Sequence, residues 1–94
     1  MTYHEALVRE LEQKLFKTLG QNEMLGTHLI YPEGEIDVYL VDFEQHRMCI
    51  YEVKSSKKHR ERGVKQLKRA KKYFEQFFDE VDIRLYLNGE ESKL

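Results

Sequence analysis

Apolar residues follow helical spacing in two segments of the chain, and strand-forming residues occupy the segments between and after them. The order of these segments predicts the order of the helices and strands. Near the N-terminus apolar residues recur every three or four residues, which is the spacing of one face of a helix. These positions are Leu7, Val8, Leu11, Leu15, Phe16 and Leu19. The spacing predicts a helix over residues 2–19, with Thr2 as its N-cap, Glu5 completing a capping box, and Gly20 ending it.

The middle of the chain is rich in Val, Ile and Tyr, which favour strands. Three strands are predicted there, over residues 26–31, 35–43 and 47–54. Pro32 and Gly34 mark a turn after the first of them. The polar link at 44–46 is short enough for a hairpin between the second and the third.

Helical spacing then returns and predicts a long helix over residues 57–78, in which Gly63 is a weak point. A final strand is predicted over 82–87, and residues 90–94 are expected to form a frayed tail. The order helix, three strands, helix, strand predicts one α/β domain over 1–94, with a four-stranded mixed sheet flanked by helices. The long helix between the third and fourth strands implies that these two strands are parallel.

Composition narrows the class of protein. The chain has 94 residues, of which 40% are hydrophobic and 35% charged, so a folded domain is expected rather than a disordered chain. The single cysteine, Cys49, excludes an intrachain disulfide and a four-cysteine zinc site. No apolar run reaches the ~20 residues of a membrane span, and no signal-peptide pattern is present. A cytoplasmic protein without membrane contact is therefore expected.

Charge is distributed unevenly along the chain. Residues 54–72 carry ten Lys or Arg and one acid, whereas the remaining residues carry six bases and sixteen acids. A basic segment on an acidic body is typical of a nucleic-acid contact surface. A helix face that is merely solvated has the same composition, and charge alone does not favour either interpretation.

The residues best suited to chemistry lie at one end of the predicted hairpin. If its two strands pair about the polar link, residues whose numbers sum to 89 are opposite each other, so Asp37 faces Glu52. Lys54 lies on the same face, two residues further on. Two adjacent carboxylates repel unless a cation lies between them, and oxygen ligands favour Mg²⁺ or Mn²⁺ over zinc. The set fits metal-assisted attack of water on a phosphodiester, or else a surface ion-pair cluster on an exposed sheet end.

Three short motifs carry a resemblance to a known family. They are GEIDV at 34–38, YEVKSS at 51–56, and Gln66 within KQLKRAKKYF. With them the chain resembles the PD-(D/E)XK nuclease superfamily, in particular small archaeal Holliday-junction resolvases and RecB-type nuclease domains. Ile36 stands where the name-giving proline would be. The resemblance implies a restriction-endonuclease-like core and a metal-dependent DNA endonuclease, with branched DNA as one candidate substrate.

The resemblance also implies roles for individual residues. Asp37 and Glu52 would bind Mg²⁺ or Mn²⁺, with the main-chain carbonyl of Val53 as a further ligand. Lys54 would assist the attacking water. Gln66 stands where RecB-type relatives carry a helical Gln near the active site.

Related nucleases often add a Glu from the first helix. Glu10 falls opposite the apolar stripe, and Glu12 lies about 10 Å further along the helix than Glu5. Glu5 is therefore the preferred candidate, although its capping role is an alternative. The neighbouring His4 is interpreted as a surface histidine or as one whose hydrogen bonds are satisfied within the fold.

Two further features concern ligands and partners. Glu35 shares a strand face with Asp37 and is a candidate to support the metal ligands or to replace one of them. The basic segment is predicted to hold the phosphates that flank the scissile bond, with salt-dependent and largely sequence-blind affinity. The residues expected to do so are Ser55, Lys57, Lys58, Arg60, Arg62, Lys65, Lys68 and Arg69.

Alternatives of other classes stay open. One is a non-catalytic nucleic-acid-binding module on the same fold, and another is a protein whose basic helix binds an acidic protein partner. A homodimer is also expected, because a domain this small gains stability by burying more surface and resolvase-like relatives are dimers.

Overall fold

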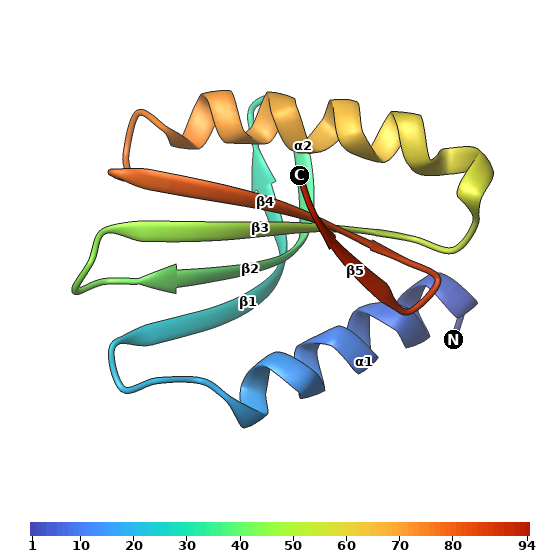
Figure 1. The fold of residues 1–94 in the computed structure, drawn as a ribbon, viewed down its shortest axis with the longest axis horizontal. Helices are drawn as coiled ribbons and strands as arrows, with labels where there is room; N and C mark the ends of the chain where they lie inside the picture. Colours follow the sequence, from blue (N-terminus) through green and yellow to red (C-terminus); the bar gives the residue numbers. More distant parts are fainter.

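Two helices cover opposite faces of one mixed sheet in the computed structural model, which describes residues 1–94 (Figure 1). The elements in chain order are α1 (Tyr3–Lys17), β1 (Glu23–Tyr31), β2 (Gly34–Asp42), β3 (Arg47–Lys54), the short 3-10 helix η1 (Lys57–His59), α2 (Arg60–Phe74), β4 (Glu80–Leu87) and β5 (Glu90–Lys93). The predicted α/β class is confirmed. Neither helix is long and apolar enough to cross a membrane.

The sheet has the strand order β1-β2-β3-β4-β5, and only β3 and β4 are parallel. The parallel pairing predicted across the α2 connection is therefore confirmed. The predicted hairpin register is also confirmed, because the β2–β3 ladder runs from Asp42↔Arg47 to Val38↔Tyr51. Each of these pairs has residue numbers that sum to 89.

The prediction of four strands and a frayed tail is wrong, because residues 90–93 form β5. Asn88 and Gly89 have φ values of 49° and 88°, which suit the two-residue turn of a hairpin. The pair therefore turns the chain back onto β4. β5 has no apolar residue, and all four of its residues are exposed, so hydrophobic patterning gives no signal for it. Arg84 on β4 bonds Glu91 at 2.8 Å and helps to hold this edge.

Several predicted boundaries also shift. The helix predicted over 57–78 is divided into η1 and α2. It ends at Phe74, and the N–H of Phe77 then donates to the Phe74 carbonyl at 2.9 Å with the three-residue spacing of a turn. β1 begins three residues earlier than predicted. α1 ends at Lys17, and the predicted N-cap is confirmed, since Thr2 Oγ1 accepts a hydrogen bond from the N–H of Glu5 at 3.1 Å.

Two hydrophobic clusters form the core, one on each face of the sheet. Alternation along β3 divides its side chains between them. The cluster under α2 includes Met48, Ile50, Leu67, Ala70, Ile83 and Leu85. The cluster under α1 comprises Leu7, Val8, Leu11, Val38, Tyr51, Val53 and Tyr86. Each helix thus buries the apolar stripe that its sequence predicts.

The β1–β2 hairpin breaks its alternation at one matched position. Val38 packs on the α1 side, whereas Ile36, which strict alternation would place on the same face, packs on the α2 side. Between these two residues lies Asp37. Asp37 and the opposing His28 are unpaired in the otherwise continuous β1–β2 ladder, and His28 has a φ of 55°. Beyond this break the hairpin tip rises behind α2 (Figure 1), where Tyr31 packs against two aromatic rings of that helix at centroid distances of 5.3 and 5.5 Å.

Candidate active site

The candidate site forms at the point where β2 leaves β3. The ladder between the two strands ends at Val38↔Tyr51, so Val53 has no β2 residue paired with it. Its N–H donates instead to Oδ2 of Asp37 at 2.9 Å. The carboxylate thus takes the place of a strand partner, and this hydrogen bond fixes Asp37 against β3.

Glu52 and Lys54 join Asp37 at this point, although the ladder ends one pair before the predicted Asp37–Glu52 pair. Glu52 is only 5% exposed, and its Oε2 lies 4.0 Å from Lys54 Nζ. Burial is the largest cause of a rise in the pKa of Glu52 to about 9, and the adjacent Asp37 carboxylate raises it further, while Lys54 opposes the rise. Two carboxylates therefore share this site with one incompletely compensating ammonium group.

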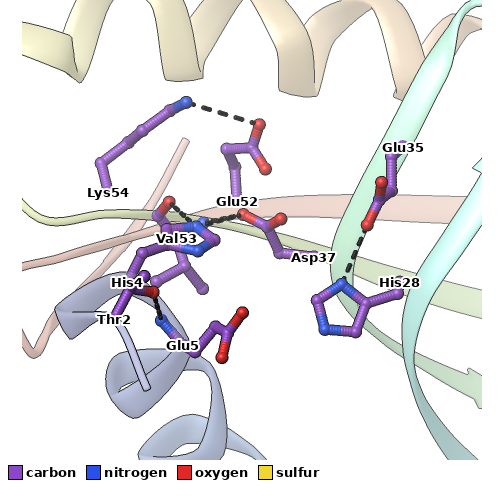
Figure 2. Close-up of polar contacts among 9 residues, drawn as sticks. All are labelled: Thr2, His4, Glu5, His28, Glu35, Asp37, Glu52, Val53 and Lys54. Atoms are coloured by element: carbon purple, nitrogen blue, oxygen red, sulfur yellow. Dashed lines mark hydrogen bonds and ion pairs between the residues drawn. The ribbon is translucent and has the colours of Figure 1, made fainter.

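His4 is a site residue that the sequence pattern does not identify. Its Nε2 lies 3.0 Å from the carbonyl oxygen of Val53 and 3.4 Å from Oδ2 of Asp37 (Figure 2). The first turn of α1 delivers it there. The available signal was its position beside Glu5, at the helix end that is expected to lie near Asp37.

The acidic residues of α1 differ in their distance from this constellation. Glu5 is exposed in the first turn, and Figure 2 shows its carboxylate on the side of Asp37 and His28, although no hydrogen bond or ion pair joins it to Asp37. Glu10 instead accepts a hydrogen bond from the Tyr86 hydroxyl. Glu5 thus stays the nearer candidate, and its role is still a prediction.

Glu35 and His28 form a pair beside the site. Glu35 Oε1 lies 2.9 Å from His28 Nδ1, and both side chains are about half exposed (Figure 2). The charge of Glu35 also contributes to the raised pKa of Glu52. The sequence assigns no role to His28, whereas the structure places it opposite Asp37 at the break in the sheet.

Gln66 approaches Glu52 from α2. The two side chains line the same small cavity of about 10 Å³, near the lower limit for one water molecule. Gln66 Oε1 is buried and accepts no hydrogen bond. This unused acceptor beside the carboxyl of Glu52 suits a residue that orients a group in the site.

Gly63 allows α2 to lie close to Lys54. A Cβ at this buried position would be 2.9 Å from Leu85 Cδ1 and 3.2 Å from Lys54 Cγ. The glycine therefore weakens the helix by propensity but permits the packing that directs the Lys54 side chain towards Glu52.

The basic residues divide between the flanks of α2. All of those predicted to bind phosphate are exposed except Ser55, which is half-buried. At 100° per residue, Arg62 and Arg69 share the flank of Gln66, whereas Arg60 and Lys68 lie elsewhere on the helix. Arg69 Nη1 donates to the carbonyl of Glu33 at 3.3 Å, which places its flank beside the β1–β2 hairpin. Only part of the basic segment thus borders the candidate site.

The oxygen donors at the site fit a hard divalent cation. Asp37 and Glu52 offer carboxylate oxygens, and Val53 offers a carbonyl that already contacts the same histidine as Asp37. No cluster of three or more His, Cys, Asp or Glu side chains is arranged to hold a metal ion. Mg²⁺ suits such a sparse set, because it is commonly held by one or two carboxylates and keeps several water ligands.

The site is therefore assembled from α1, β2, β3 and α2, and each element contributes a different polar group. Comparison with known proteins identifies no relative that shares this geometry. No family model, curated protein or solved structure matches the chain.

Proposed function

We propose that the protein is a Mg²⁺-dependent deoxyribonuclease of the PD-(D/E)XK type, with a restriction-endonuclease-like core, that hydrolyses phosphodiester bonds in DNA. The observation that carries this proposal is the convergence of Asp37, Glu52, Val53 O and Lys54 where β2 leaves β3. A buried carboxylate beside a partly buried one destabilises the fold, and a cation is the partner that such a pair lacks.

Each polar group of the site would have a separate role in cleavage. Asp37, Glu52 and the Val53 carbonyl would hold the ion, and a bound Mg²⁺ would activate water and neutralise charge on the phosphodiester. The N–H of Val53 holds Asp37 in orientation before any ion arrives. Lys54 supplies a positive charge that orients the attacking water or steadies a phosphate oxygen, and His4 positions the two oxygens that it contacts.

Substrate affinity would come from the basic residues. Arg62 and Arg69 border the site and would contact phosphates next to the scissile bond, while the other cations of α2 would add long-range attraction. Such contacts read the backbone rather than the base sequence. Duplex and branched DNA are both candidate substrates.

A second candidate function is a non-catalytic nucleic-acid-binding module on the same fold. It is favoured by one observation, that Arg60 and Lys68 lie away from the helical flank that borders the carboxylates. Binding through the outer face of α2 would not need the site at all.

The test is cleavage of end-labelled duplex, single-stranded and four-way-junction DNA in Mg²⁺, Mn²⁺ or EDTA. We expect cutting of at least one substrate with metal and none in EDTA. The double variant Arg62→Gln/Arg69→Gln should lower kcat/KM about tenfold, whereas the matched variant Arg60→Gln/Lys68→Gln should change it less. Salt-sensitive binding with no cutting in either metal would instead support the non-catalytic module.

A further inference from the structure

The tip of the β1–β2 hairpin carries an isoleucine that no other part of the fold covers. Ile30 is 79% exposed, more than any other large hydrophobic residue of the chain. Its strand neighbours Leu29 and Tyr31 pack with the core cluster under α2. Because side chains alternate along a strand, Ile30 points to the opposite side of the hairpin. One exposed apolar side chain is ordinary on a protein surface, so the place of Ile30 has to give it a meaning.

That place is beside the candidate site. Ile30 pairs with Glu35 across the hairpin, so their side chains lie on the same face. Glu35 lines the small cavity that Glu52 and Gln66 also line, and Figure 2 shows it next to Asp37. From Glu35 to Asp37 is about 7 Å along β2, at ~3.3 Å per residue. This distance corresponds to about two base pairs of a bound duplex, at ~3.4 Å each.

Contacts with α2 hold the hairpin tip in place. The ring centroid of Tyr31 lies 5.3 Å from that of Tyr73 and 5.5 Å from that of Phe74. Arg69 Nη1 donates to the carbonyl of Glu33 at 3.3 Å. The tip is therefore fixed to the same helix flank whose arginines would bind phosphate. A side chain held on such a support loses little conformational entropy when it enters a substrate.

The carboxylates of the site are recessed. Glu52 is only 5% exposed, and the side chain of Asp37 is 14% exposed. A phosphodiester held in the regular backbone of a stacked duplex lies on a convex surface and approaches such a recess poorly. Cleavage at this site would therefore be helped by a local distortion of the DNA.

We propose that Ile30 is a wedge, an apolar side chain that enters the base stack beside the scissile phosphate and unstacks one base step. The inference rests on the proposed function and concerns how the same site engages its substrate. Isoleucine has no group that could bind phosphate, whereas such apolar side chains are the ones that proteins insert between bases to kink DNA. Arg62 and Arg69 hold the backbone while Ile30 parts the bases. The favoured substrate is then DNA whose step at the cut is weakly stacked.

The first test compares two duplexes of the same sequence, one fully paired and one with a mismatch at the mapped cleavage position. We expect Ile30→Ser to lower kcat/KM about tenfold on the paired duplex but less than about twofold on the mismatched one, where stacking is already disrupted. Ile30→Leu keeps a branched apolar side chain and should cut both duplexes like the wild type. Equal losses on the two duplexes, or no loss on either, would overturn the proposal.

Phe43→Ser is the matched control for this comparison. Phe43 is also exposed, at 58%, but it directly follows β2 at the end opposite the hairpin tip. This variant should cut both duplexes like the wild type, and equal effects of Phe43→Ser and Ile30→Ser would contradict a specific role of the tip. Circular dichroism melting establishes that each variant is folded.

The second test does not depend on cleavage, so it separates the wedge from the nuclease activity. Duplex DNA with 2-aminopurine at several positions is saturated with protein in EDTA, and the fluorescence rises where a labelled base loses its stacking. We expect a rise with the wild type that is lost in Ile30→Ser. No rise with the wild type at saturation, or no binding of DNA, would overturn the wedge. A rise without any cutting in Mg²⁺ would support the wedge and contradict the nuclease instead.

Discussion

Replacing Asp37 with asparagine is expected to lower kcat/KM for metal-dependent DNA cleavage at least about a thousandfold. The amide oxygen of asparagine can still accept the hydrogen bond from Val53 N–H, which is 2.9 Å long in the native protein. The side chains are nearly equal in size, so the bend of β2 at this point is retained. What the substitution removes is the negative charge that would hold the ion.

The measurement is single-turnover cleavage of the best substrate at saturating Mg²⁺. Lys54→Gln should lower the rate about a hundredfold, because the site then lacks its ammonium group but keeps both carboxylates. Asp79→Asn is the matched control, since Asp79 is exposed and only its backbone N–H bonds elsewhere, to His46 O. Cleavage by Asp37→Asn at the wild-type rate would show that the activity lies at another site.

Replacing Glu52 with glutamine is expected to stabilise the metal-free protein, and increasingly so as the pH rises. Burial and the adjacent Asp37 carboxylate raise the pKa of Glu52 to about 9, from the ordinary value of 4.5. Between these values the folded protein keeps a proton that the unfolded chain releases. The free energy of unfolding therefore falls as the pH increases through this window, by at most ~1.36 kcal/mol per pH unit. Glutamine does not titrate and avoids this loss.

The expected gain is small at pH 4 and roughly 2 kcal/mol or more at pH 8, measured by urea unfolding in EDTA. Glu61→Gln, at an exposed position of α2, serves as the control and should change the unfolding free energy by less than about 0.5 kcal/mol. Adding Mg²⁺ should stabilise the wild type more than the variant, because only the wild type has both carboxylates. A Glu52→Gln variant as stable as the wild type at every pH would contradict the account of a strained carboxylate pair.

The juxtaposition of Asp37 and Glu52 could be predicted because it depends on local rules. Strand alternation and a short hairpin link determine which residues face each other, and the register from Asp42↔Arg47 to Val38↔Tyr51 follows those rules. The two helical stripes were predictable for the same reason. Each of these features is encoded within a short stretch of sequence.

The break in the sheet at Asp37 and His28 could not be predicted in this way. The positive φ of His28 is retained because tertiary packing holds the hairpin tip, where Tyr31 contacts the aromatic rings of α2. β5 was missed for a different reason, since its charged residues have no hydrophobic pattern and backbone pairing with β4 maintains it. Both features depend on contacts between segments distant in the sequence.

The contribution of His4 also depends on tertiary structure. Only the docking of α1 across the sheet brings its Nε2 to the oxygens of Asp37 and Val53. The same holds for the basic residues of α2. Their angular positions around the helix, and the hydrogen bond from Arg69 to Glu33 O, show which of them border the site. Composition identifies a basic segment but does not divide it between flanks.

The central claim is that the protein has a metal centre where β2 leaves β3. It is tested most directly by titrating Mn²⁺ into the metal-free protein without DNA and monitoring binding by electron paramagnetic resonance. We predict one Mn²⁺ bound per chain and displaced by Mg²⁺, with the affinity reduced at least about tenfold in Asp37→Asn and unchanged in the Asp79→Asn control. Failure of the wild type to bind Mn²⁺, or equal binding by Asp37→Asn, would contradict a metal centre at the point where β2 leaves β3.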